Sequence, residues 1–191
     1  MSTKLKKTAV IILNRNLPKV TNKLRSRILK YNKKYVDIFI IDAGSDKKLI
    51  SKYTSFIASW KSAKKNGLRF ARGMNLGLGK LWQENLFKKY DYFFLLTNDS
   101  VVPKSSFIKK MVQIMKKNKK IGLLSPCSEN WGEKNYLIKR KTKFFWFIHN
   151  NAYLLRREFI EDVMSIKKPH YMNFLFDGKN FRGYGIESEL I

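Results

Sequence analysis

Polar side chains stand just after three apolar runs of the chain, and they are the first candidates for chemistry. They are Asn14 after TAVIIL (8–13), Asp42 after VDIFII (36–41), and Asn98 with Asp99 after YFFLL (92–96). Residues of these types after a strand are often ordinary turn formers or helix N-caps. Ligands of open α/β sheets bind beyond the carboxyl ends of the strands, so three such ends together favour a ligand site.

Asp99 is the candidate metal ligand. At the end of an apolar strand its carboxylate is expected to be poorly solvated, and a divalent cation would compensate the charge. Mn²⁺ or Mg²⁺, bound by one or two carboxylates together with substrate phosphates, suits such a site. The metal would neutralise a diphosphate leaving group. His149 and His170 are further candidate ligands.

The segment NGLRFARGMNLG (66–77) could meet phosphates. Its glycines permit close backbone approach, and Arg69 and Arg72 supply positive charge. It contains neither G-x-x-x-x-G-K-[ST] nor G-x-G-x-x-G after a strand, which argues against a P-loop and a dinucleotide site. Near the end of the chain, GYGIESEL (183–190) places Glu187 and Glu189 after a glycine-flanked aromatic. Such a carboxylate could be a general base, although a Glu-rich helix N-terminus is the simpler explanation.

Apolar periodicity predicts strands that alternate with helices. The expected strands are 8–13, 36–41, 56–60, 92–96, 121–124 and 144–148. The expected helices are 18–33 with an apolar stripe of Val20, Leu24, Ile28 and Tyr31, then 73–84, one that begins at Pro103, and 156–164. This alternation indicates a single α/β domain over 1–191, with a mostly parallel central sheet flanked by helices.

The chain is strongly basic and rich in core-forming residues. Its 191 residues include 40 Lys and Arg against 14 Asp and Glu, a net charge of +26, and 14 Phe, 9 Tyr and 4 Trp. The aromatics exclude a disordered basic tail. The single cysteine excludes an intramolecular disulfide, and no apolar run reaches the roughly 18 residues of a membrane span, so we expect a cytoplasmic protein. The positive charge would suit binding to nucleic acid, an anionic membrane or a phosphorylated ligand. Codon bias is another explanation for the excess of lysine.

Six segments, in order from Thr8 to Leu190, resemble motifs of family 2 glycosyltransferases of the GT-A fold. AVIILNRN resembles the family's first strand, DAGSD its D-x-G-S-x-D turn, and GLRFARGMNLG its G-F-x-x-G-x-N-x-G segment. LLTNDS resembles the L-L-N-D-D-T metal motif, with Thr97 where the family usually has Asp or Asn. HNNAYLLRREFIEDV is similar to a small-residue patch followed by R-R-E-x-F, and GYGIESEL to the G-x-[DE]-D-x-x-L segment that carries the base.

The resemblance implies a transferase that moves a hexosyl or rhamnosyl group from a nucleoside diphosphate sugar to an acceptor hydroxyl, with inversion. Mn²⁺ or Mg²⁺ is the implied cofactor, held by Asp99, and Glu187 is the implied base with Glu189 as the alternative. The implied donor-binding residues are Asn14, Asp42, Gly44, Arg72, Gly73, Asn75 and Asn98. The acceptor would be a glycan or a lipid-linked molecule. A peripheral contact of the protein with the anionic inner face of the membrane is an option, and binding to nucleic acid is not expected.

Two other interpretations stay open. Family members usually continue with a helix and an acceptor-facing segment, so we expect this chain to lack the usual C-terminal extension, and an inactive truncated homologue is one alternative. The other is a basic module that binds nucleic acid or an anionic surface. It would use lysines interleaved with aromatics, as in KRKTKFFWF (139–147).

Overall fold

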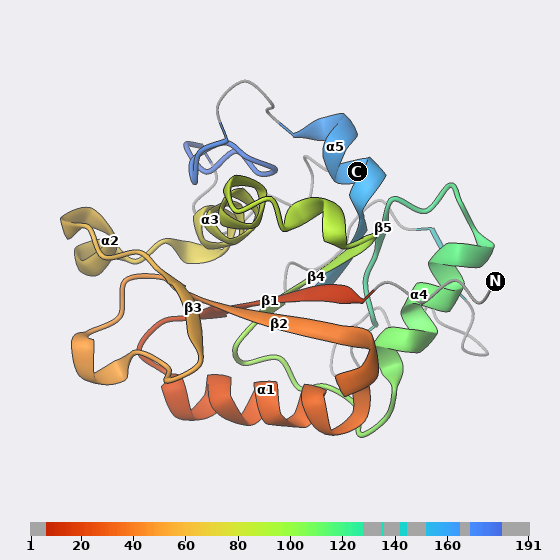
Figure 1. The fold of residues 1–191 in the computed structure, drawn as a ribbon, viewed down its shortest axis with the longest axis horizontal. Coiled ribbons are helices and arrows are strands. Elements are labelled where there is room, and N and C mark those ends of the chain that lie inside the picture. The colour runs from red at the N-terminus through yellow and green to blue at the C-terminus, as the bar shows by residue number, and fades with distance from the viewer. Residues whose placement is uncertain (1–6, 128–134, 136–141, 145–151, 165–168, 181–191) are drawn as a thin grey trace.

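A six-stranded sheet forms the centre of the molecule in the computed structural model, which describes residues 7–127, 135, 142–144, 152–164 and 169–180 (Figure 1). The strands are β1 (Thr8–Asn14), β2 (Val36–Asp42), β3 (Thr54–Ile57), β4 (Tyr92–Thr97), β5 (Leu123–Leu124) and β6 (Ala152–Arg156). Their order is β3-β2-β1-β4-β6-β5, in which β3, β2, β1 and β4 are parallel and β6 is antiparallel to β4 and β5. The predicted mostly parallel α/β sheet is confirmed.

Strand β6 was not predicted from the sequence. It pairs with β4 from Tyr92 opposite Arg156 to Leu96 opposite Ala152, and its central residues Tyr153 to Leu155 are fully buried. Its few apolar residues lie directly before a helix, so periodicity alone does not separate the two elements. Of the strand expected at 144–148, Phe144 is 87% exposed and lies in no strand, and 145–148 lie outside the described residues.

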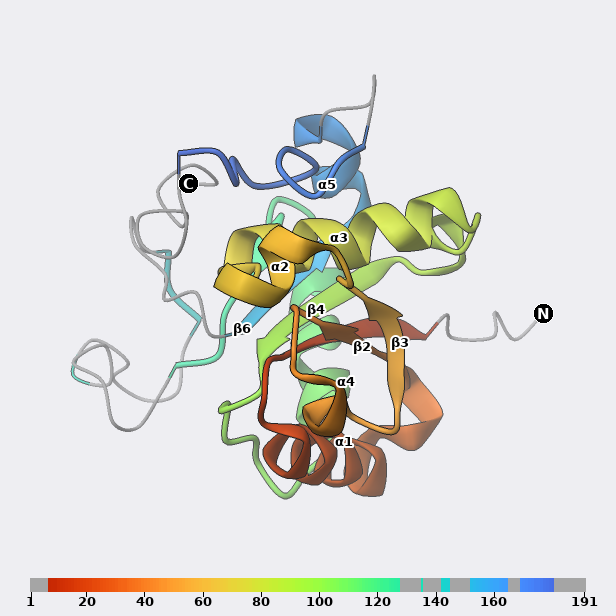
Figure 2. The ribbon, with the colours of Figure 1, turned by 90° about the vertical axis from the view of Figure 1, so that its left-hand side faces the viewer.

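Helices cover both faces of the sheet. They are α1 (Pro18–Asn32), α2 (Lys61–Asn66), α3 (Arg69–Gln83), α4 (Phe107–Lys117) and α5 (Arg157–Val163), with short 3₁₀ turns at Lys33–Tyr35, Lys47–Leu49 and Phe87–Lys89. Figure 1 shows α1 and α4 on one side of the sheet and α3 and α5 on the other, and the rotated view in Figure 2 agrees. Within the described ranges, no helix is long and apolar enough to cross a membrane.

Three helix predictions need correction in detail. The buried stripe of α1 is Thr21, Leu24, Ile28 and Asn32, and Val20 is 41% exposed. Thr21 and Asn32 take the buried positions because each finds hydrogen-bond partners in other elements. Helix α3 begins at Arg69 instead of Gly73, and α4 begins at Phe107, four residues after Pro103.

Two hydrophobic clusters lie on the two faces of the sheet. One joins α1 and α4 to Val10 and Ile12 of β1, and the other joins α3, α5 and residues 174–176 to Ala9 and Ile11. Successive residues of β1 therefore point to opposite clusters, as in a strand buried on both faces. This explains why β1 and β4 are continuous apolar runs.

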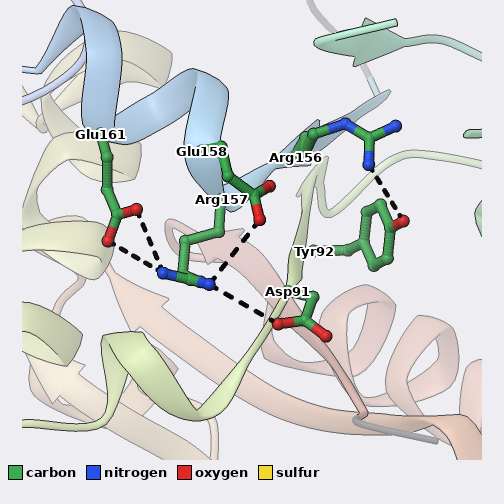
Figure 3. Close-up of polar contacts among 6 residues, drawn as sticks. All are labelled: Asp91, Tyr92, Arg156, Arg157, Glu158 and Glu161. Atoms are coloured by element: carbon green, nitrogen blue, oxygen red, sulfur yellow. Dashed lines mark hydrogen bonds and ion pairs between the residues drawn. The ribbon is translucent and has the colours of Figure 1, made fainter. Parts of the chain in front are cut away.

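Two adjacent arginines hold β6 and α5 in place (Figure 3). Arg156 donates to the backbone oxygens of Met115 (2.6 Å) and Ile121 (3.2 Å) and to the Tyr92 hydroxyl (3.4 Å). Arg157 pairs with Asp91, Glu158 and Glu161. Burial raises the pKa of Tyr92, against the opposing effect of Arg156. The arginine pair of the R-R-E-x-F-like segment therefore joins this segment to α4 and to the start of β4.

Candidate functional site

Strands β1, β2 and β4 end at the same edge of the sheet. Asn14 pairs in register with Asp42, and Leu13 pairs with Thr97. Because the three strands are parallel, their carboxyl ends lie side by side, as the sequence predicts. The turns that follow these strands form the candidate site, which we call the carboxyl edge.

Asn14 and Asp42 interact directly. The Asn14 Nδ2 group donates to Asp42 Oδ2 (2.9 Å), and both side chains are completely buried. The other carboxylate oxygen, Asp42 Oδ1, accepts from the backbone N–H groups of Gly44 (3.2 Å) and Ser45 (2.8 Å). Such hydrogen bonds compensate the burial of a carboxylate. The buried Asp42 carboxylate therefore fixes the backbone of the turn after β2.

The network continues into α1 and the turn after β4. Thr21 Oγ1 donates to Asn14 Oδ1 (2.8 Å) and accepts from Asn98 Nδ2 (3.4 Å). Thr21 is fully buried, and the sequence analysis missed it. A signal was present, because Thr21 occupies the same helical stripe as Leu24 and Ile28, where an apolar residue is usual. The network brings the predicted residues Asn14, Asp42 and Asn98 together.

Gly44 is required by the geometry of the turn after β2. Its φ is +93°, and a Cβ at this position would lie 2.1 Å from the backbone oxygen of Ala63 in α2. The turn and α2 therefore approach more closely than any side chain permits. Gly44 therefore allows the Asp42–Ser45 turn to pack against the backbone of α2.

We expect Gly44→Ala to lower the free energy of unfolding by about 2–4 kcal/mol, because it adds a left-handed strain and a clash with backbone. The matched control is Gly79→Ala in the middle of α3, where a Cβ would meet only Phe174 Cδ2 at 3.8 Å. That substitution should stabilise the helix by about 0.5–1 kcal/mol. Urea unfolding measures both variants. Equal effects of the two alanines would contradict the close approach at Gly44.

Asp99 lies in the turn after β4 and is exposed to solvent. This corrects the expectation of a poorly solvated carboxylate, because the chain leaves the sheet at Thr97 and turns outward, with the Ser100 N–H donating to the Thr97 oxygen (3.3 Å). Across the described residues, no group of three or more His, Cys, Asp or Glu could hold a metal. A lone exposed carboxylate fits a Mn²⁺ or Mg²⁺ ion whose other ligands are donor phosphates and water, and does not fit a metal held by protein alone.

Of the two candidate histidine ligands, the structure describes one. His170 is exposed, and its Nδ1 accepts from the Met172 N–H (3.3 Å). Its ring lies against Tyr171, with centroids 4.3 Å apart. His149 lies outside the described residues.

Residues 69–77 of the glycine segment form the first part of helix α3, and Asn66 is the last residue of α2. A Cβ on Gly73 would lie 2.2 Å from Leu13 Cδ1, and one on Gly77 would lie 2.9 Å from Ile41 Cγ1. These glycines therefore let α3 pack closely on β1 and β2. Because Leu13 is next to the end of β1, the first turn of α3 lies at the carboxyl edge. Arg69, exposed with φ +56°, begins this turn.

Asn75 joins α3 to the segment 169–180. It is fully buried, and its Nδ2 group donates to the backbone oxygens of Tyr171 (3.1 Å) and Phe176 (2.7 Å). Its Oδ1 accepts from the N–H groups of Leu175 and Phe176, both at 2.9 Å. All four hydrogen-bonding positions of the Asn75 amide are thus taken, and none remains for a bound ligand.

The segment 169–180 is held by further contacts. Arg72 Nε donates to the Gly178 oxygen (2.6 Å), and the side chains of Phe174, Leu175 and Phe176 are buried in the core. The Asn180 N–H is the largest influence that lowers the pKa of Asp177, and the Lys179 N–H acts in the same direction. The candidate bases Glu187 and Glu189 lie outside the described residues.

The sheet order and its polar carboxyl edge are those of a protein with a GT-A-like fold. A solved structure with this fold is the mannosyltransferase PcManGT from Pyrobaculum calidifontis, determined in complex with GDP-Man and Mn²⁺. The TM-score is 0.59 at 13% sequence identity, and the match covers 84% of this chain and 47% of that one. This chain thus spans about half the length of the mannosyltransferase. No protein-family model matches the sequence. No curated protein matches it either.

Proposed function

We propose that this protein is a glycosyltransferase of family 2 type that moves a sugar from a nucleoside diphosphate donor to an acceptor hydroxyl. The observation that carries the proposal is the fold shared with a mannosyltransferase that binds GDP-Man and Mn²⁺. The hydrogen-bonded group of Asn14, Asp42 and Thr21 at the carboxyl edge supports it, because ligands of such sheets bind there.

In this proposal the nucleoside lies over the turn after β2. Asp42 and Asn14 are positioning residues, because both are buried and bind each other and the Gly44–Ser45 backbone. Asn98 holds the turn after β4 against Thr21. Asn75 and Gly73 place α3 and segment 169–180, so their contribution to donor binding is indirect.

The diphosphate would lie near the first turn of α3 and the turn after β4. Arg72 is the proposed cation, since the Gly178 oxygen fixes its Nε and thereby the plane of its guanidinium. Asp99 would hold the divalent cation, which when bound supplies charge neutralisation for the departing diphosphate. Glu187, with Glu189 as the alternative, would take the proton of the acceptor hydroxyl. A base on the face opposite the leaving group gives inversion at the anomeric carbon.

The test is a thermal-shift titration with GDP-mannose and other nucleoside diphosphate sugars, with and without Mn²⁺. A donor at one hundred times its Kd should add about 2.7 kcal/mol, which corresponds to roughly 5–10 °C in Tm for a chain of this size. No response to any donor, with or without metal, would contradict the proposed function.

Asp99→Ala should remove the additional Tm increase that Mn²⁺ gives in the presence of the donor, because the metal would lose its protein ligand. Mn²⁺ without nucleotide should shift the Tm of neither protein, since a single carboxylate binds it weakly. Asp162→Ala, which removes an exposed carboxylate from α5, is the matched control and should behave as wild type. A Mn²⁺ increment that survives in Asp99→Ala would exclude Asp99 as the ligand.

A further inference from the structure

Helices α1 and α4 form one layer of the molecule and contain no acidic residue. The sequence has no Asp or Glu between residues 15 and 34 or between 100 and 120. The two helices pack on the same face of the sheet, and Asn32 at the end of α1 donates to the Ser105 oxygen just before α4. The acidic side chains Glu158, Glu161 and Asp162 lie on α5, on the other side of the sheet. The positive charge of this layer is therefore not offset by acidic side chains of its own helices.

Lysines occupy the outward stripes of this layer. Lys19, Lys23 and Lys30 are exposed on the side of α1 opposite its buried stripe. Lys110 and Lys117 are exposed on α4, away from its buried residues Ile108 and Met111. Because both helices cover the same face of the sheet (Figure 1), these lysines share one side of the molecule. We call this surface the α1–α4 basic face.

The geometry points to an anionic lipid bilayer as the partner of the α1–α4 basic face. Point charges spread along helices suit the negative potential of a membrane surface, where each Lys adds to the attraction. Two aliphatic side chains are also exposed at the start of α1, Leu17 just before the helix at 48% and Val20 in its first turn at 41%. These can enter the headgroup region, whereas they contribute no bond to a phosphate of nucleic acid. Tyr31 of α1 is half-buried, with Lys30 Nζ 5.7 Å from its ring centroid, and Phe107 of α4 is buried, so neither helix presents a fully exposed ring on which a base could stack.

This orientation would bring the carboxyl edge close to the lipid headgroups. Helix α1 starts four residues after Asn14, and its Thr21 is hydrogen-bonded to Asn14. A bilayer against α1 thus lies beside the candidate site, where a lipid-linked acceptor would be presented. That last step rests on the proposed transferase function, whereas binding to lipid does not require it.

The test is co-sedimentation of the full chain with phosphatidylcholine vesicles that contain or lack phosphatidylglycerol, at low salt. Wild type should bind only the anionic vesicles and dissociate at high salt. The triple variant Lys19→Glu, Lys23→Glu, Lys30→Glu should lose about 100-fold or more in partition coefficient, at roughly fivefold per lysine. The matched control is Lys61→Glu, Lys64→Glu, Lys65→Glu on α2, which changes the net charge equally at three exposed positions and should retain most binding.

Three results would overturn the proposal. Wild type could fail to bind the anionic vesicles, or both triple variants could lose binding equally, which would mean that net charge alone attracts the protein. In the third result, wild type does not bind vesicles but binds a single-stranded oligonucleotide in a salt-sensitive way, and the α1 variant loses this binding. That result would assign the face to nucleic acid. Circular dichroism verifies that both variants are folded. None of these measurements uses a sugar donor, so a failure here is separate from a failure of the proposed function.

Discussion

Replacing Asn75 with alanine is expected to lower the free energy of unfolding by about 3–5 kcal/mol. The substitution leaves two backbone N–H groups and two backbone oxygens of residues 171–176 without their partner in a fully buried place. Each such group costs about 1–3 kcal/mol when it stays unsatisfied, and the costs add only in part because the segment can relax. Urea unfolding followed by circular dichroism measures the change.

Two further variants separate the roles of the Asn75 amide. Asn75→Asp keeps an acceptor for the N–H groups of Leu175 and Phe176. It replaces the Nδ2 group with an oxygen that faces the backbone oxygens of Tyr171 and Phe176, so it should also lower the free energy of unfolding. The control is Asn118→Ala, which removes an exposed amide with one hydrogen bond, to Ile114, and should cost under about 1 kcal/mol. An Asn75→Ala variant as stable as the control would mean that segment 169–180 does not depend on this amide.

The second large effect concerns the proposed base. We expect Glu187→Gln to lower kcat by about 10²–10⁴-fold, because the amide cannot accept the proton of the acceptor hydroxyl. Donor affinity, measured by calorimetry with Mn²⁺, should remain that of wild type, since the carboxylate would act on the acceptor and not on the nucleotide. The acidic limb of the pH–rate profile should disappear in the variant.

Glu189→Gln is the matched comparison, because it makes the same chemical change two residues later. If Glu187 is the base, Glu189→Gln should retain kcat within a few-fold, and if the large loss appears in Glu189→Gln, the base is Glu189. Full activity in both variants would contradict general-base catalysis by this segment. Loss of donor affinity in Glu187→Gln would instead give the residue a role in nucleotide binding.

The exposure of Asp99 changes what the metal proposal requires. A buried carboxylate without hydrogen-bond partners would need a cation to compensate its charge, whereas an exposed one is solvated and can bind metal together with the nucleotide. The expected behaviour is therefore joint binding of donor and Mn²⁺. This is also why the predicted Tm change of Asp99→Ala appears only when both are present.

Much of the fold followed from local patterns. The runs TAVIIL and YFFLL consist of β-branched, aliphatic and aromatic residues. This composition predicts strands buried on both faces, and the structure forms β1 and β4 there. Pro18 marked the first residue of α1, since proline is pre-organised for that position. Asn14 and Asp42 were recognised as neighbours because parallel strands place their carboxyl ends at one edge. These features depend on residues that are close in sequence or on simple sheet geometry.

Tertiary structure alone decided the roles of the buried polar side chains. Asn75 was predicted to bind the donor, and its four partners lie about a hundred residues away in the chain. Thr21 interrupts an apolar stripe because Asn14 and Asn98 supply its hydrogen bonds, and β6 entered the sheet between β4 and β5 without a distinct pattern. A sequence pattern reports whether a position is buried, because burial has the period of the helix or strand. It does not report the partner, because hydrogen bonds in the interior are made by whichever distant segment the folded chain brings there.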